Sequence, residues 1–173
     1  MKTRGNTKRG VKKEQRVAVF VDVSNLYHSA KNLYNKKVSF PNLLRIAVED
    51  RKLVRAIAYG VRSDINEQKK FFDILKKFGY EVKLKDLQVF PGGAKKGDWD
   101  IGIAMDMIEL SPKVDVEILI SGDGDFVDLV NHLHRACGIK VEAASFRRST
   151  SKHLVDIVDK FIDLGKFKKT VLM

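Results

Sequence analysis

The amino-acid sequence predicts a three-layer α/β/α domain with a central, mostly parallel sheet of about five strands. Short runs rich in β-branched and other apolar residues recur along the chain, and helix-like stretches separate them. Parallel strands need long, usually helical crossovers, and a strand buried on both faces is apolar throughout. With 173 residues and 44% hydrophobic content, the chain is long enough to bury one core of this kind.

The start of the predicted domain consists of one strand followed by two helices. Residues 16–22 (RVAVFVD) are apolar and β-branched, as expected of a buried strand that ends at an acid. Ser24 or Asn25 would cap a helix over residues 26–35. A proline suits the first turn of a second helix, which we expect over residues 41–50.

The middle of the chain predicts a strand, a helix, a short strand and a loop. Residues 53–61 (LVRAIAYGV) form the second apolar run. Asp64 is expected to cap a helix over residues 65–79, in which apolar residues recur at helical spacing. A short strand follows at residues 80–84, and the glycine-containing segment 89–97 is predicted to be a loop.

The remainder of the predicted domain alternates between helix and strand. A helix over residues 98–110 leads to the most apolar strand, residues 114–120. A helix at 126–137, which ends before a glycine, precedes the last strand at 139–144. The final helix is expected over residues 149–162. Helices between successive strands are typical of βαβ units in a parallel sheet.

Both ends of the chain are basic. Residues 1–14 hold six Lys or Arg and one Glu, and we expect a disordered basic arm there. The domain is predicted over residues 15–165, followed by a shorter basic tail at 166–173. The whole chain has 33 Lys and Arg against 22 Asp and Glu, a net charge of +11, which favours a polyanionic partner such as nucleic acid.

The composition also excludes some classes of protein. The single cysteine, Cys137, excludes an internal disulfide and a zinc site built from several cysteines. No apolar run reaches the ~18 residues of a membrane span, and the basic N-terminal segment lacks the apolar core of a signal peptide. We therefore expect a cytoplasmic protein that does not contact a membrane.

Five aspartates stand where predicted strands end or a predicted helix begins. Asp22 closes the first strand, and Asp123 and Asp125 follow closely after the fourth. Asp98 and Asp100 begin the central helix, where capping is the favoured role of Asp98. If the first and fourth strands are neighbours, these acids converge at one edge of the sheet, where open α/β sheets bind their ligands.

Clustered carboxylates need a cation or a proton. Two of them repel by about 4 kcal/mol at ~4 Å and an effective dielectric of about 20. A hard divalent cation suits a site made of oxygen ligands, and it would convert the acidic pocket into a phosphate site. Such a cation polarises a phosphoryl oxygen and activates water, which points to chemistry on phosphate esters.

Several polar residues have a simpler structural role as the alternative. Asp125 precedes an apolar helix and could act only as its N-cap. Asp106 lies six residues beyond Asp100, about 120° further round the helix, so it is either a more distant support for the site or a salt-bridged residue. Asn25 could cap the first helix or position a metal-bound water or a phosphate. Ser121 could position the same water or phosphate from the opposite side.

A phosphate-bearing substrate also needs basic contacts near the acids. Basic residues expected at the same edge of the sheet are Lys95, Lys96, Arg62, Arg147 and Arg148. They are candidates for phosphate contacts that weaken as salt rises. Trp99 could stack on a base, although core packing is the favoured interpretation. The absence of a motif for the DNA major groove favours single-stranded or structured RNA.

Three segments in a fixed order resemble a known family. They are DVSN after the first strand, KKGDWDIGIAMD on the central helix and SGDGDFVDLV after the fourth strand. Together they resemble the NYN domain of the PIN-like nuclease superfamily, in its LabA-like branch, over roughly residues 17–158. The resemblance implies a PIN-like fold, and it implies metal-binding acids at Asp22, Asp100, Asp123 and Asp125, with Asn25 beside them as a further catalytic residue. It also matches a recurrent acid of the family to Asp106.

The sequence therefore predicts a metal-dependent endoribonuclease that hydrolyses RNA phosphodiester bonds with Mg²⁺ or Mn²⁺. Relatives often have one acid where this chain has two, and Asp100 is chosen over Asp98 as the ligand. The alternative is a non-catalytic RNA-binding or regulatory module that retains the acidic cluster. A small-molecule phosphohydrolase is a third interpretation, and the sequence is compatible with a homodimer.

Overall fold

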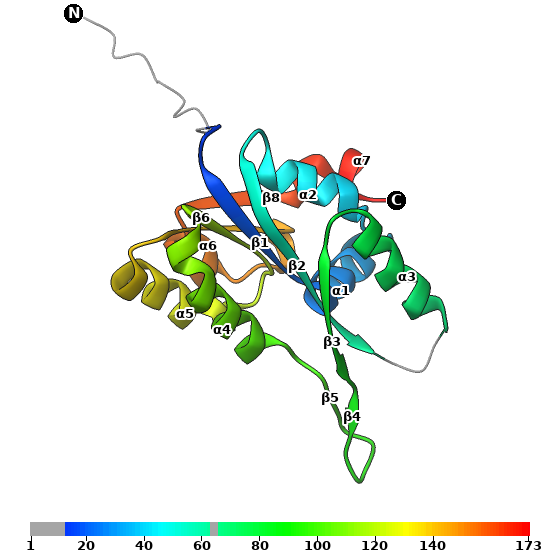
Figure 1. Ribbon diagram of the computed structural model, residues 1–173. Helices are drawn as coiled ribbons and strands as arrows, with labels where there is room; N and C mark the ends of the chain where they lie inside the picture. Colours follow the sequence, from blue (N-terminus) through cyan, green and yellow to red (C-terminus); the bar gives the residue numbers. More distant parts are fainter. Residues whose placement is uncertain (1–12, 63–65) are drawn as a thin grey trace, which may run out of the picture.

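A six-stranded, fully parallel sheet forms the centre of the protein (Figure 1). The structure is a computed structural model, and it describes residues 13–62 and 66–173. The strands of this sheet are β1 (Arg16–Asp22), β2 (Lys52–Arg62), β3 (Glu81–Asp86), β6 (Val116–Ile120), β7 (Lys140–Ser145) and β8 (Lys160–Asp163). The parallel sheet predicted from the sequence is confirmed, with one strand more than expected.

Helices cover both faces of the sheet and complete the three layers (Figure 1). One face carries α1 (Val23–Tyr34), α2 (Phe40–Val48), α3 (Asn66–Lys77) and α7 (Lys168–Val171). The other face carries α4 (Asp100–Leu110), α5 (Val127–His132) and α6 (Lys152–Ile157). In β1, Val17, Val19 and Val21 pack into the first core, whereas Ala18 and Phe20 pack into the second. None of the helices in the described ranges is long and apolar enough to span a bilayer.

The order of the strands determines where a ligand site can form. The order is β3-β2-β1-β6-β7-β8, so the chain builds outward from β1 in one direction and then from β6 in the other. β1 and β6 are paired in parallel, with Val21 opposite Ile120, so their carboxyl ends lie side by side. Open α/β sheets bind ligands at this reversal of strand order. The first and fourth predicted strands are thus neighbours, as the convergence of the acids requires.

One predicted helix is shorter than expected. The sequence predicted a helix over residues 149–162, but α6 covers only Lys152–Ile157, and Lys160–Asp163 form β8 instead. β8 pairs with β7 through four residues, Glu142 to Ser145, whose backbone groups would otherwise form an open edge. The need to pair that edge outweighs the local helical pattern.

The segment predicted to be a loop at residues 89–97 contains a small hairpin. β4 (Gln88–Val89) pairs in antiparallel fashion with β5 (Lys95–Lys96). Gly92 and Gly93 both have positive φ, at 96° and 86°, which glycine adopts without strain. The hairpin projects from the sheet near the start of α4 (Figure 1).

The segment predicted as a basic tail at residues 166–173 is docked onto the domain. Val171 on α7 is fully buried, and Val38 and Leu172 form an antiparallel bridge. The backbone N–H of Ser39 donates to the Val171 carbonyl at 2.8 Å. Most of the predicted arm at residues 1–14, and the predicted cap Asp64, lie outside the described residues.

Glu117 on β6 is a carboxyl group buried without a partner. It is fully buried, and neither side-chain oxygen has a hydrogen-bond partner. It shares the face of Leu119, in the core beneath α4 and α5. Burial raises its pKa to about 8. Glu142 differs, because its two oxygens accept hydrogen bonds from Arg51 at 2.8 and 2.9 Å. Glu117 therefore stays protonated at neutral pH.

We expect Glu117 to make the protein less stable in alkaline solution. The pKa is raised from 4.5 in the unfolded chain to about 8, so the folded protein binds more protons in this window and its free energy of unfolding falls as pH rises. Glu117→Met should abolish the fall between about pH 4.5 and 8 and raise the free energy of unfolding by a few kcal/mol above about pH 8. Urea unfolding at a series of pH values measures this.

The exposed Glu109 on α4 provides the matched control. Glu109→Met should retain the pH dependence of the parent protein. Parallel pH profiles for the parent and Glu117→Met would contradict the assignment of the titrating group.

Candidate metal centre

Asp22 links the end of β1 to the start of α1. Its Oδ1 accepts a hydrogen bond from the backbone N–H of Asn25 at 3.2 Å, so Asp22 is the N-cap of α1. The sequence had assigned that cap to Ser24 or Asn25 and begun the helix later, and the structure corrects both points. Oδ2 of Asp22 accepts from the hydroxyl of Ser121 at 3.4 Å. Burial, followed by the charge of Asp123, raises the pKa of Asp22.

The loop after β6 is held by hydrogen bonds to its own backbone. Oδ1 of Asn25 accepts from the N–H of Gly122 at 3.0 Å, and the Ser121 hydroxyl accepts from the N–H of Asp123 at 3.2 Å. Asp123 Oδ1 accepts from the N–H of Asp125 at 2.9 Å, which makes Asp123 the cap of the turn Gly124–Phe126. The sequence offered N-capping as the alternative role of Asp125. In the structure Asp123 makes the capping bond instead.

The two glycines of this loop lie against the segment that follows β7. A Cβ on Gly122 would be 2.9 Å from the carbonyl oxygen of Ser149, and one on Gly124 would be 2.8 Å from Oγ of Ser151. The N–H of Ser151 also donates to the carbonyl of Gly122 at 2.9 Å. The lack of side chains at both positions allows this close approach. The ends of β1, β6 and β7 therefore fix the conformation of the acidic loop together.

The start of α4 brings Asp100 to the same place. α4 begins at Asp100, and Trp99 is in the N-cap position without a side-chain cap bond, so the predicted capping role of Asp98 is wrong. Trp99 packs beside Tyr59, with ring centroids 5.3 Å apart, and its Nε1 donates to the Gly60 carbonyl at 2.8 Å. Core packing, the favoured interpretation of Trp99, agrees with these contacts, which anchor the N-terminus of α4.

The acids converge as a group of three with a fourth beside it. Asp100, Asp123 and Asp125 each offer a carboxylate oxygen within 4.8 Å of the others. Asp22 lies outside that group but contacts it through Ser121. Burial, and then the charges of Asp123 and Asp22, raise the pKa of Asp100 to about 6. A site with so much uncompensated negative charge favours a bound cation.

Asp106 belongs to a different network. Its Oδ2 accepts from the hydroxyl of Tyr59 at 2.7 Å and from Nζ of Lys83 at 2.6 Å. Six residues correspond to about 9 Å along a helix axis, so Asp106 lies well away from Asp100. Of the two roles predicted for Asp106, the structure shows the salt bridge. Lys83 was not predicted as its partner, although the alternation of β3 places Lys83 on the face of Tyr59, its neighbour in the sheet.

Basic residues flank the acids on both sides. Arg147 and Arg148 are exposed on the turn after β7. On the other side, Lys85 lies 4.3 Å from the ring centroid of Trp99 and donates to the carbonyl of Asp98 at 3.1 Å. Lys85 was not among the predicted contacts. Arg62 was among the predicted contacts, and its Nε donates to Oδ1 of Asp86 at 2.8 Å. Lys95 and Lys96, also predicted, form strand β5, just before α4.

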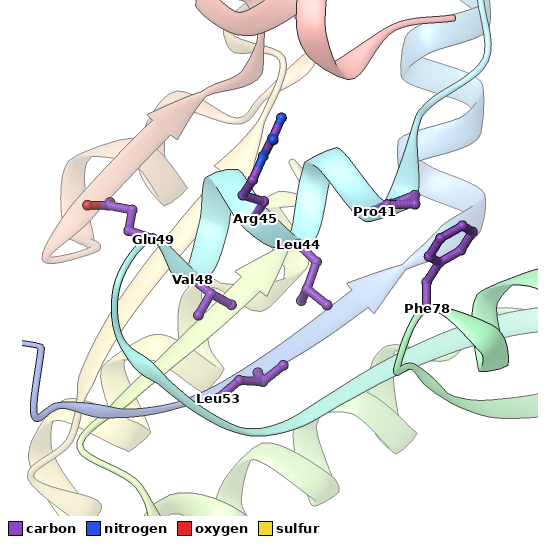
Figure 2. A pocket seen from close by; sticks show the side chains of 7 residues that line it. All are labelled: Pro41, Leu44, Arg45, Val48, Glu49, Leu53 and Phe78. Carbon is purple, nitrogen blue, oxygen red and sulfur yellow. The ribbon is translucent and has the colours of Figure 1, made fainter.

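The hollow shown in Figure 2 is remote from this chemistry. It has a volume of about 280 Å³ and lies between α2, the start of β2 and the end of α3. Its lining includes Leu44, Val48, Leu53 and Phe78 and none of the clustered aspartates. Asp100 and Asp123 are half-buried and Asp125 is exposed, so the candidate centre lies at the surface of the sheet edge.

Comparisons with known proteins place these features in context. Residues 16–165 match the family model described as NYN domain. The chain is 27% identical to the Low amplitude and bright protein LabA of Synechococcus elongatus over 165 residues, 90% of this chain and 87% of that protein. A solved structure of a Vibrio parahaemolyticus protein of unknown function has a TM-score of 0.85 and 34% identity, covering 95% of this chain and 99% of that one. Both relatives are matched over most of their length.

We expect Asp100→Asn to stabilise the metal-free protein. The raised pKa of Asp100 means that the folded state holds an extra proton between about pH 4 and 6, so stability falls as pH rises through that window. Replacing the carboxylate relieves part of this repulsion, and the melting temperature in EDTA at pH 7 should rise by about 2–4 °C. Differential scanning calorimetry with and without Mn²⁺ measures the effect.

Added Mn²⁺ should raise the melting temperature of the parent protein more than that of Asp100→Asn. The control Asp73→Asn, at an exposed position on α3, should respond to Mn²⁺ like the parent. An equal Mn²⁺ response in all three proteins would show that Asp100 is not part of a metal site.

Proposed function

The chain belongs to the NYN domain family, which is part of a nuclease-like superfamily, and we propose from this premise that the protein is a metal-dependent ribonuclease. The proposed reaction is endonucleolytic hydrolysis of RNA phosphodiester bonds. The observation that supports it best is the group formed by Asp100, Asp123 and Asp125 at the reversal of strand order, with Asp22 alongside.

The donor set fits a hard divalent cation. All candidate ligands are carboxylate oxygens, and these suit Mg²⁺ or Mn²⁺ better than softer metals that prefer sulfur or imidazole. In this proposal Asp22, Asp100, Asp123 and Asp125 hold the cation. When bound, it supplies Lewis acidity toward a phosphate and offsets the repulsion among the carboxylates.

The remaining polar groups position the acids. Ser121 joins Asp22 to Asp123 through its hydroxyl, and Asn25 holds the backbone of Gly122. In the proposal the side-chain amide N–H of Asn25 orients a phosphate oxygen, because the hydrogen bond to Gly122 uses only the oxygen of this side chain. Asp98, at the exposed edge, adds negative charge that raises the pKa values of Asp22 and Asp100.

RNA is the proposed substrate because of the charge distribution. The protein carries a net charge of +11 even though it gathers several acids into one site. Arg147 and Arg148 on one side, and Lys85 on the other, give an approaching phosphate backbone basic contacts that flank the acids. The β4–β5 hairpin, whose second strand is Lys95–Lys96, leads into the start of α4. A single strand suits an open edge better than an enclosed nucleotide pocket.

We expect the purified protein to cleave labelled single-stranded RNA in the presence of Mn²⁺ and to stop cleaving when EDTA is added. Asp22→Asn should lower kcat about 100-fold or more, because it removes a negative charge from the site. The variant should still fold, because the asparagine keeps a side-chain oxygen that can cap α1. Cleavage is followed on denaturing gels, and circular dichroism verifies that the variant is folded.

Asp156→Asn, at an exposed position on α6 and outside the group of clustered acids, serves as the control and should cleave at the parental rate. Full activity of Asp22→Asn would point to a contaminant. RNA binding without cleavage under every divalent cation would favour the non-catalytic module, and turnover of nucleotides alone would favour a phosphohydrolase.

A further inference from the structure

A second hollow, surrounded by lysines, lies between α7 and the C-terminal end of α1. It has a volume of about 210 Å³ and is lined by Tyr34, Lys36, Lys168, Lys169 and Leu172. No carboxylate lines it, and all three lysines are exposed. Within the described residues, the ion pairs formed by lysine involve Lys52, Lys83 and Lys160 and none of these three. The floor of the hollow is mostly apolar, and the three exposed lysines surround it with no carboxylate among the lining residues.

The two segments that build the hollow are fixed to one another. Asn35 ends α1 in the left-handed conformation, with φ of 51°, and turns the chain so that Lys36 follows directly. The N–H of Met173 donates to the carbonyl of Lys37 at 2.9 Å, and the buried Val171 anchors α7. Lysines that are more than 130 residues apart in the chain are therefore held together by the backbone.

Composition reinforces the charge of this surface. Residues 31–37 (KNLYNKK) and 164–173 (LGKFKKTVLM) contain six lysines and no acid. Phe167 is 42% exposed between Lys166 and Lys168. An exposed aromatic ring among lysines is the combination that binds single-stranded nucleic acid, since bases stack on the ring while lysines neutralise phosphates.

The hollow is connected to the acidic centre along the carboxyl edge of the sheet. β1, β6, β7 and β8 are successive neighbours, so the edge from Asp22 to Asp163 spans about 14 Å at the usual strand spacing. Arg147 follows β7, and its N–H donates to Oδ1 of Asp163 at 3.2 Å. Tyr34 packs on Phe146 with ring centroids 5.3 Å apart. Along this edge the basic groups are Arg147 after β7 and the lysines of the hollow after β8, with Asp163 at the end of β8 between them in the chain.

We propose that this lysine hollow is a phosphate subsite for single-stranded RNA whose chain continues from the acidic centre along the ends of β7 and β8. The inference rests on the proposed ribonuclease function and names the path of its substrate. Lys36, Lys168 and Lys169 contact phosphates several nucleotides away from the scissile bond, and Phe167 stacks on a base. The subsite selects for strands long enough to reach it.

The test compares a long and a short RNA. Fluorescence anisotropy in EDTA measures binding of single strands of about 16 and about 4 nucleotides to the full chain. The triple variant Lys36→Ala/Lys168→Ala/Lys169→Ala should weaken binding of the long strand at least tenfold and leave binding of the short strand within twofold. The slope of log K against log salt for the long strand should fall by about 2, since three contacts each contribute about 0.7.

A control with the same loss of charge separates a subsite from a general electrostatic effect. Lys76→Ala/Lys77→Ala/Lys113→Ala removes three exposed lysines that lie before β3 and β6, at the opposite edge of the sheet. It should change long-strand affinity less than twofold. Equal losses in both triple variants, or none in the hollow variant, would overturn the proposal.

Cleavage assays with Mn²⁺ separate this inference from the proposed function. The hollow variant should show a raised KM for the long strand with kcat unchanged. If the parent does not cleave RNA but the hollow variant loses long-strand affinity, the ribonuclease proposal fails and the subsite stands. If the parent cleaves and the hollow variant matches it in KM for both strands, the subsite fails and the ribonuclease proposal stands.

Discussion

The parallel pairing of β1 with β6 is the constraint on which the candidate site depends. It places the end of β1, at Asp22, beside the loop that carries Asp123 and Asp125. Carboxylates this close repel one another, and the fold resists the repulsion with hydrogen bonds from Ser121 and from backbone N–H groups. The acids therefore keep their arrangement at a cost in stability, which is a common property of functional sites.

The edge of the sheet is divided electrostatically. The group of three acids lies at the end of β6 and the start of α4, with Asp22 at the end of β1, whereas the segments after β7 and β8 carry arginines and lysines. A polyanion is attracted to the basic flanks and repelled by the bare acids, so its approach and the occupation of the acidic centre by cations are coupled. Such a division explains why a chain with a net charge of +11 can contain so acidic a centre.

Sequence alone predicted the features that depend on local pattern. The apolar runs gave the parallel sheet, and the acids after those runs were expected to converge because parallel strands share their carboxyl edge. The features it missed depend on partners distant in the chain. β8 forms because β7 offers an unpaired edge, and the C-terminal segment docks because Val171 finds an apolar site. Asp106 is bound by Lys83 from another element, which no spacing within α4 reveals. The capping role of Asp22 depends on the exact residue at which β1 ends and α1 begins, and the apolar pattern does not define that residue.

The docking of residues 171–173 against residues 37–39 has a consequence for synthesis of the protein. The backbone of residues 37–39 is paired only when residues 171–173 are in place. In the same way, the free edge of β7 is paired only when β8 has formed. During translation the growing chain therefore exposes an open strand edge and an uncovered apolar site until residues 160–173 have left the ribosome. Intermediates with open strand edges and exposed apolar surface are prone to aggregation, so the hazard for this domain ends only when its C-terminal segment is in place.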